Sequence, residues 1–203
     1  MLLIIICICL TFIALILTII WLLKTSGLFH SIRVHVKEPP IDECFIAYKF
    51  QRGPYSTAAD IFKDIMNFSP SANTIGIYYD DPNSVSSESC RFIVGAVLGK
   101  NQESADEDLM KRMIAEEYKT FQLPKSVQSV YTAFPCESVF SIYIAIHRVY
   151  RHLSSFIQTK KLQAYPFVEY YEPTLIHFYA PLSNHDAYNV PDLKLVEQTN
   201  KTD

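Results

Sequence analysis

The sequence lacks the common signatures of catalysis. It contains no nucleophile elbow, no His-Glu-x-x-His, no Cys-x-x-Cys and no phosphate-binding loop. His147 and His152 are five residues apart, so on a helix they would point about 140° from each other and could not hold one metal from the same face. We therefore expect a protein that is not an enzyme and that has no metal site and no cofactor.

The chain also lacks an excess of charge of either sign. It carries 18 basic and 21 acidic residues, a formal net charge of −3, which argues against nucleic acid as a direct partner. The five cysteines are too few and too scattered for a disulfide scaffold. We predict that those outside the apolar N-terminus are reduced and that they lie in the cytosol.

Residues 1–23 contain no charge, no glycine and no proline, and this apolar run ends at Lys24. A helix of that length is roughly 34 Å long, which is enough to cross a bilayer. A cleaved signal peptide would need a positive start, a shorter apolar run and a better cleavage site. A buried core helix of this length would be unusual in a small domain. We predict a retained transmembrane helix over 1–23.

The charges near this run predict its orientation. Lys24, Arg33 and Lys37 follow it, and no Lys or Arg precedes it, so the body should be cytosolic and the N-terminus luminal. The sequences beginning at Asn67 and Asn200 read as glycosylation sites, but they would be used only if the body were luminal.

Three segments follow the predicted span. Residues 24–43, with Pro39 and Pro40, read as a juxtamembrane stalk, 44–182 as one domain, and 183–203 as a short C-terminal tail. Apolar spacing in the domain predicts helices at 55–68, 109–118 and 138–159, and strands at 44–50, 74–79, 91–98, 129–134, 165–171 and 175–180. Residues 101–108 read as a mobile acidic connector.

The order of these elements predicts an α+β fold built from a duplicated β-α-β-β unit, with the halves offset by about 85 residues. The two main helices should cover one face of the sheet, and the groove between the halves is a natural ligand cleft. On the helix at 138–159 the core-facing stripe is predicted to be Val139, Ile142, Ile146, Val149, Leu153 and Phe156.

Several short motifs occur together in this chain. They are Ile46-Ala-Tyr-Lys-Phe50 with Gly53-x-Tyr55, Ile77-Tyr-Tyr-Asp80 with Pro82, Cys90-Arg91 with Val94-Gly95, Ser141-Ile142 with Arg148-Val149, and Ala164-Tyr-Pro166 with Glu169-x-Tyr171 and Ile176-His-Phe178. As a set, and with the apolar N-terminus, they resemble the testis-expressed ER-phagy receptor family over about residues 1–190.

The resemblance implies a single-pass protein of the endoplasmic reticulum membrane, with the nuclear envelope as an alternative location, and a cytosolic GyrI-like domain. It implies an adaptor or receptor related to selective ER autophagy (reticulophagy) and to repair of protein–DNA crosslinks, with an AAA unfoldase or the autophagy machinery as protein partners. The rival interpretation is a membrane-tethered small-molecule-binding protein or hydrolase of the same fold.

One departure from the family concerns the long acidic tail that carries an aromatic-x-x-aliphatic motif for autophagy modifiers. Only 21 residues follow Leu182, and Tyr188–Pro191 lacks the final aliphatic residue. Tyr179–Leu182 matches the aromatic-x-x-aliphatic pattern, but it ends a strand that is predicted to lie in the core. We therefore expect a short form that engages the autophagy machinery indirectly.

GyrI-like domains are similar in lining their cleft with aromatics and often one carboxylate, and Glu169 matches that carboxylate's place. A small cationic or aromatic ligand would then meet Glu169, Tyr48, Tyr78, Tyr131, Phe167 and Tyr171. The alternative is that Glu169 is exposed or paired with a lysine, and that the aromatics are ordinary core residues. Arg148, Arg151, Lys160 and Lys161 form a candidate face for anionic lipid or an acidic partner, or are simply solvated.

Overall fold

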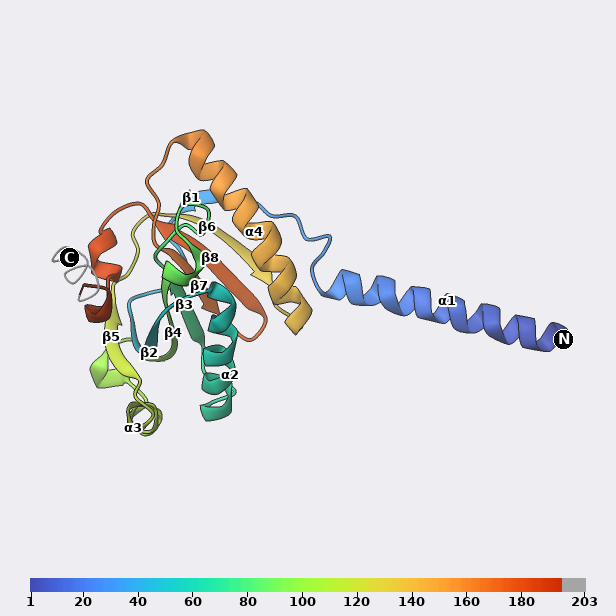
Figure 1. The fold of residues 1–203 in the computed structure, drawn as a ribbon, viewed down its shortest axis with the longest axis horizontal. Coiled ribbons are helices and arrows are strands. Elements are labelled where there is room, and N and C mark those ends of the chain that lie inside the picture. The colour runs from blue at the N-terminus through green and yellow to red at the C-terminus, as the bar shows by residue number, and fades with distance from the viewer. Residues whose placement is uncertain (195–203) are drawn as a thin grey trace.

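A computed structural model describes residues 1–194 of the chain. Helix α1 (Leu2–Thr25) projects away from the rest of the protein (Figure 1), and its 24 residues span roughly 36 Å. No residue of α1 is buried, and the hydroxyls of Thr11 and Thr18 donate to main-chain carbonyls one turn earlier. A helix this apolar, with its polar groups satisfied internally, suggests association with a membrane.

Eight strands form one sheet in the order β1-β6-β8-β7-β3-β4-β2-β5, and every neighbouring pair is antiparallel. The alternating apolar residues predicted most of these strands. Their bounds are β1 (His35–Lys37), β2 (Cys44–Arg52), β3 (Thr74–Tyr78), β4 (Arg91–Gly99), β5 (Lys119–Leu123), β6 (Ser129–Pro135), β7 (Phe167–Tyr171) and β8 (Leu175–Pro181).

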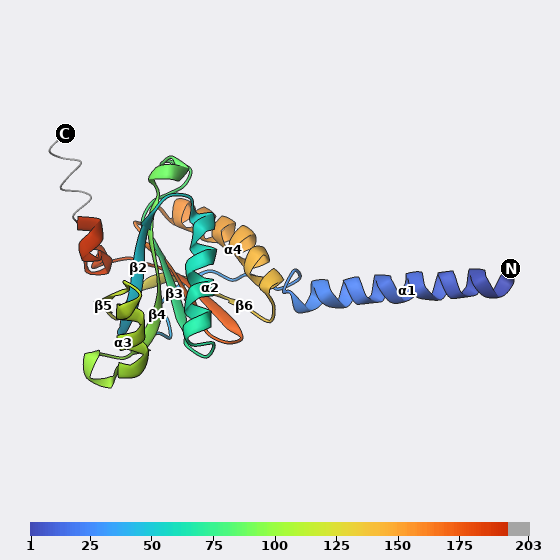
Figure 2. The same ribbon diagram turned by 60° about the horizontal axis from the view of Figure 1, so that its bottom comes forward.

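The duplicated order of elements is confirmed. The first unit is β2-α2-β3-β4 and the second is β6-α4-β7-β8, and pairing between β3 and β7 joins them. Figures 1 and 2 show α2 and α4 on the same side of the sheet. The helices of the domain are α2 (Ala58–Phe68), α3 (Glu107–Ala115) and α4 (Val139–Lys160), with 3-10 turns η1 (Tyr55–Thr57), η2 (Ser87–Ser89), η3 (Gln102–Ser104) and η4 (His185–Tyr188).

Segments on both sides of residues 44–182 also pack on the domain. Strand β1 lies in the expected stalk and pairs with β6. Beyond β8, Tyr188, Val190 and Leu193 are buried and cover Ile75, Ile77 and other apolar residues on the sheet face opposite the helices. Without this cover that face would be exposed to water.

The predicted core stripe of α4 is partly wrong. Val149 and Leu153 are fully buried, but Val139 is 67% exposed and Ile146 is 41% exposed. The small residues Ser141 and Ala145 share the buried face with Val149 and Leu153 instead, because they let the helix lie close to β6 and β8.

Strand β5 was not predicted, and the connector is more regular than expected. Residues 101–108 contain the turn η3 and the start of α3. The Asn101 side chain accepts a hydrogen bond from the Ser104 N–H, and Asp106 caps α3 at Leu109. These side chains satisfy the free N–H groups at each start, so a polar composition here does not mean a lack of structure.

Candidate functional site

Glu169 lies on β7 at the junction of the two halves and is 1% exposed. Its carboxylate accepts hydrogen bonds from the hydroxyls of Tyr171 (2.6 Å), Tyr150 (2.7 Å) and Tyr78 (3.2 Å). The donors come from β7, α4 and β3, so both repeats contribute. We call Glu169 and these three tyrosines the carboxylate cage.

Burial is the main influence on the acidity of this cage. It raises the pKa of Glu169 above its usual value, while the three tyrosine hydrogen bonds act in the opposite direction. Burial, reinforced by the charge of Glu169, raises the pKa of Tyr78, Tyr150 and Tyr171 well above 10. The hydroxyls therefore stay protonated and remain hydrogen-bond donors over the physiological range.

The cage is filled by the protein's own side chains. Gly76 is the direct cross-strand partner of Glu169, and a Cβ at Gly76 would lie 3.1 Å from the Tyr78 hydroxyl and 3.3 Å from the Phe62 ring. The Phe62 ring from α2 also packs edge-on against Tyr171. Glycine at this position thus leaves room for the aromatic side chains that close over the carboxylate.

The structure divides the predicted aromatic set between the two faces of the sheet. Phe167 packs against Tyr150 beside the cage, whereas Tyr48 and Tyr131 lie on the opposite face, because strand side chains alternate between faces. The Tyr48 hydroxyl donates to the Asp192 carboxylate at 2.8 Å, and the Tyr131 hydroxyl oxygen lies 2.8 Å from His177 Nδ1. The six predicted residues therefore do not line one common cleft in this structure.

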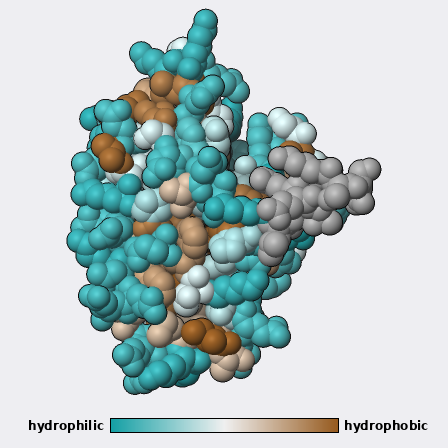
Figure 3. Space-filling view, turned by 90° about the vertical axis from the view of Figure 1, so that its left-hand side faces the viewer, coloured by the Kyte–Doolittle hydropathy of each residue, from teal (hydrophilic) through white to brown (hydrophobic). Residues whose placement is uncertain are grey.

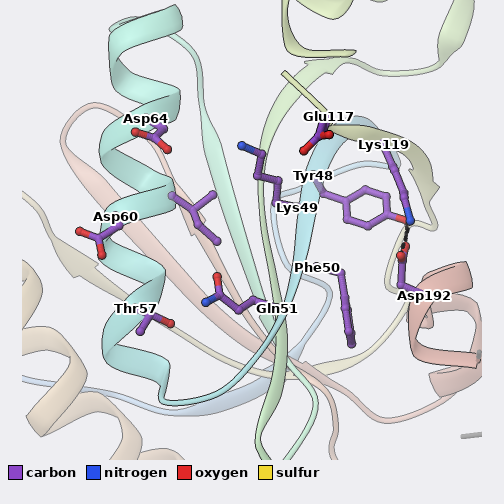
Figure 4. Close-up of a pocket in the computed structure, with 11 residues that line it drawn as sticks. Tyr48, Lys49, Phe50, Gln51, Thr57, Asp60, Asp64, Glu117, Lys119 and Asp192 are labelled. Atoms are coloured by element: carbon purple, nitrogen blue, oxygen red, sulfur yellow. Dashed lines mark hydrogen bonds and ion pairs between the residues drawn. The ribbon is translucent and has the colours of Figure 1, made fainter. Parts of the chain in front are cut away.

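A separate open groove of about 500 Å³ lies beside β2 (Figure 4). Lys49 and Gln51 point toward α2, which contributes Asp60 and Asp64, while Tyr48 and Phe50 point to the other side of β2. The remaining lining residues are Thr57, Ile61, Glu117, Lys119 and Asp192.

Figure 3 shows an apolar band between hydrophilic residues on the side of the molecule that carries β5.

The charges of this groove are mainly acidic. Asp60 and Asp64 are exposed on α2. Lys119 pairs with Asp192, and the Lys49 ammonium lies 4.4 Å from the centre of the Tyr118 ring. The two lysines are thereby engaged. Among residues 1–194 neither Asp60 nor Asp64 forms an ion pair, so the α2 side of the groove presents negative charge to a binding partner.

An unpaired strand edge adjoins the groove. Strand β5 pairs with β2 only from Cys44 to Tyr48. The Gly53 N–H donates at 2.8 Å to the carbonyl of Cys90, the residue just before β4. By alternation, the main-chain groups of Phe50 and Arg52 therefore face away from β4. Within residues 1–194 no strand pairs with that edge. An edge of this kind is a template for an added strand.

The predicted basic face is not one continuous surface. Arg148 directs its guanidinium to the carbonyls of Gly27 (3.1 Å) and Leu28 (2.6 Å) just after α1. Arg151, Lys160 and Lys161 are exposed, and Lys160 lies roughly 18 Å along the helix axis from Arg148. The structure thus assigns Arg148 to a contact within the chain and separates it from the two lysines.

Tyr150 of the cage, and Phe62, which packs against the cage residue Tyr171, are not among the site residues predicted from the sequence. Both are on helices, and their approach to β7 depends on how the helices cross the sheet. The apolar spacing of the helix at 138–159 was the available signal, but Tyr150 lies outside the stripe read from it.

Together these features define an α+β domain of two strand–helix–strand–strand repeats, joined to an apolar helix of membrane-spanning length. Human testis-expressed protein 264 is 34% identical to this chain over 183 residues, which are 90% of the chain and 58% of that protein. The mouse homologue is 34% identical over 173 residues, or 85% of the chain and 56% of its length. The chain thus spans little more than half of these curated relatives, and the similarity supports the relationship to the testis-expressed family that the motifs predicted.

No protein-family model matches the chain. Among solved structures, the C-terminal domain of EcmrR has a TM-score of 0.47 and 15% identity, covering 75% of this chain and 98% of that chain. A hydrolase from Listeria innocua has a TM-score of 0.42 and 12% identity, covering 79% and 98%.

Proposed function

We propose that this chain is a membrane-anchored adaptor of the testis-expressed 264 type, with a GyrI-like domain that binds an extended segment of a protein partner. One contrast carries the proposal. The Glu169 carboxylate is closed off by three tyrosine hydrogen bonds, whereas the groove beside β2 is open and is bordered by an unpaired strand edge. A partner that adds a strand at β2 would hydrogen bond to main-chain groups of Phe50 and Arg52.

The charge of the groove indicates the chemistry of that segment. Asp60 and Asp64 would face basic side chains of the partner, and Phe50 would meet an apolar one. This function needs no catalytic group, in keeping with our proposal that the chain is not an enzyme. The related adaptor roles in reticulophagy and in repair of protein–DNA crosslinks, with an AAA unfoldase among the partners, are the biological setting that we propose.

The rival function is a tethered receptor or hydrolase for a small cationic or aromatic molecule. The buried carboxylate and its raised pKa favour it, because such a group attracts a cation once it ionises. Binding at this site would require the rings of Phe62 and Tyr171 to move apart. The two functions therefore depend on different residues and can be separated by mutation.

Reversing the groove charge should abolish partner capture. In the detergent-solubilised full chain, Asp60→Lys with Asp64→Lys would oppose a basic segment, and we expect loss of most of a protein partner captured from cytosol. The matched control is Glu88→Lys with Glu103→Lys, which makes the same charge change at exposed sites outside the groove. Mass spectrometry of captured proteins is the measurement.

Three results of this comparison would argue against the adaptor. Equal loss with both double variants would indicate a nonspecific charge effect, and no loss with either would exclude the groove. Retention of a cationic small molecule that Glu169→Gln releases would favour the rival receptor.

We propose that the protein resides in the endoplasmic reticulum membrane, or in the nuclear envelope continuous with it, with its N-terminus in the lumen. Asn67, near the end of α2, should then stay unglycosylated in microsomes. Asn200 lies outside the described residues, and the same result is expected there. A glycosylation tag added before Met1 is the internal control and should be modified. A mass shift from the untagged chain that endoglycosidase removes would place the body in the lumen.

Autophagy modifiers should not bind directly to Tyr179–Leu182. Tyr179 is 3% exposed, and its strand β8 is paired on both sides, with β6 and β7. An aromatic-x-x-aliphatic motif must be free to add a strand to the modifier. Titration of a purified modifier should show no saturable binding at about ten micromolar. Binding that Tyr179→Phe preserves and Tyr179→Ala removes, without unfolding, would contradict this prediction.

A further inference from the structure

The N-terminal half of α4 exposes four large apolar side chains. Phe140 is 60% exposed, Val139 and Tyr143 are each 67% exposed, and Ile146 is 41% exposed. Their spacing places them on one side of the helix, opposite the buried Ala145 and its neighbours. A contiguous apolar surface of this kind usually marks an interaction site. We call Val139, Phe140 and Tyr143 the apolar end of α4.

This apolar end lies where the membrane helix meets the domain. In Figures 1 and 2 the N-terminal end of α4 lies beside the C-terminal end of α1. Arg148, two turns into α4, donates to the carbonyls of Gly27 and Leu28, which follow α1 directly. Phe29 is the next residue, and it is 72% exposed.

The connection between α1 and the domain is packed against the domain. Ser26 is 1% exposed and donates to the Leu22 carbonyl at 2.7 Å, which ties the turn to the end of α1. Gly27 has φ of +79°, and a Cβ there would lie 2.8 Å from the Phe134 ring. The His30 ring packs edge-on against Phe134 at 5.4 Å, and strand β1 follows. The domain is therefore held close to the end of α1.

We propose that the apolar end of α4, together with Phe29, inserts into the surface of the bilayer that α1 crosses. The inference rests on the membrane anchor of the proposed function. Aromatic side chains with an apolar body and, for Tyr143, a polar tip are suited to the boundary between headgroups and acyl chains. Lys24 at the end of α1 and Arg33 before β1 are exposed cations close to Phe29 in the sequence and fit anionic headgroups, whereas Glu137 is the carboxylate at the start of α4.

Tethering makes such a small patch sufficient. A few apolar side chains would recruit a free domain only weakly, as a single short lipid chain does. Here α1 already holds the domain at the membrane, so insertion is intramolecular and pays little further entropy. A second copy of the chain is the other candidate occupant, but the bilayer is favoured because the patch adjoins the span itself.

Fluorescence depth measurements on the full chain test the proposal. The single tryptophan, Trp21, lies in α1 and is first replaced by Phe. Phe140→Trp or Tyr143→Trp is then introduced, and the protein is reconstituted in phosphatidylcholine–phosphatidylserine vesicles with or without bromine on the acyl chains. Met66→Trp is the matched control, since Met66 is 59% exposed and belongs to α2, a helix that lies away from α1 in Figure 1. We expect blue-shifted emission and loss of most of it to brominated lipid at positions 140 and 143, and neither effect at 66.

The outcomes separate the surface contact from the anchor. Emission at the wavelength of water-exposed tryptophan, unquenched by bromine, would overturn the contact if the protein still resists carbonate extraction. Release by carbonate would overturn the anchor itself. A blue shift that bromine does not quench and that grows with the protein-to-lipid ratio would show that a second copy covers the patch, and would also overturn the proposal.

Discussion

Val149→Asp should unfold the domain. Val149 is fully buried between α4 and the sheet, among Val130, Phe134 and Phe178. An aspartate there would be a charge without a partner in an apolar core, at a cost of about 4–5 kcal/mol, comparable to the whole stability of many domains. Loss of the cooperative unfolding transition, followed by circular dichroism in detergent, is the measurement.

Ile146→Asp is the matched control, on the same helix and with the same introduced charge. Ile146 is 41% exposed, so the new carboxylate can reach water, and we expect a change below about 1 kcal/mol. If this variant unfolded as completely as Val149→Asp, the assignment of the buried face of α4 would be wrong.

Glu169→Ala should lower the free energy of unfolding by about 3 kcal/mol or more. The substitution leaves the hydroxyls of Tyr78, Tyr150 and Tyr171 without their acceptor inside the protein, and a buried unsatisfied polar group costs about 1–3 kcal/mol. Removing the carboxylate also removes the free-energy cost of burying it, and this gain offsets part of the lost stability. Chemical denaturation at neutral pH measures the difference, and Glu169→Gln, which keeps an acceptor oxygen, should lose less.

The pH dependence of stability gives an independent check on the same group. Because the folded pKa of Glu169 is raised, the folded state holds a proton in a range where the unfolded state has released it. Stability from this group is therefore fully present below pH 4.5, the ordinary value, and is lost as pH rises through the folded pKa. Glu169→Gln should remove the part of the pH dependence of the free energy of unfolding that comes from this group. Identical slopes in both proteins would mean that Glu169 ionises normally.

Local pattern predicted the repeat because its strands are strongly apolar and its turns contain proline and glycine. Strand β1 was not predicted because its three residues are all exposed. It therefore lacks the alternation of apolar and polar residues that indicates a strand. Strand β5 has the mixed sequence Lys-Thr-Phe-Gln-Leu and depends on its pairing with β2. Edge strands of this kind are stabilised by the sheet they join, which sequence alone does not reveal.

Val139 and Ile146 are wrongly predicted to face the core for a related reason, whereas Ile142, Val149, Leu153 and Phe156 of the same stripe do pack on it. Val139 and Ile146 are apolar, and a surface that faces lipid has the same composition as one that faces a core. Ser141 and Ala145 carry little apolar signal because they are small, yet they are buried where α4 lies close to the sheet. The proposed membrane contact of α4 would account for the exposed apolar residues.

The carboxylate cage was predicted in part. Strand alternation correctly placed Phe167, Glu169 and Tyr171 on one face of β7. Alternation within one strand could not show that Tyr48 and Tyr131 lie on the sheet face opposite Glu169. Which residues of distant strands share a face depends on the register of the pairing between strands. Tyr150 required knowledge of where α4 crosses β7, which is a tertiary contact.

The fixed junction after α1 gives the domain two opposite poles. Figure 1 shows α1 leaving from one side of the domain, while β5 and the last described turn, η4, lie on the other. The groove beside β2 includes Lys119 of β5 and Asp192 after η4, so it opens on the pole remote from α1. A partner docked there would stand one domain's width from the membrane surface. Large assemblies could therefore reach the groove without colliding with lipid, and reorienting the domain would require breaking the Arg148 contacts first.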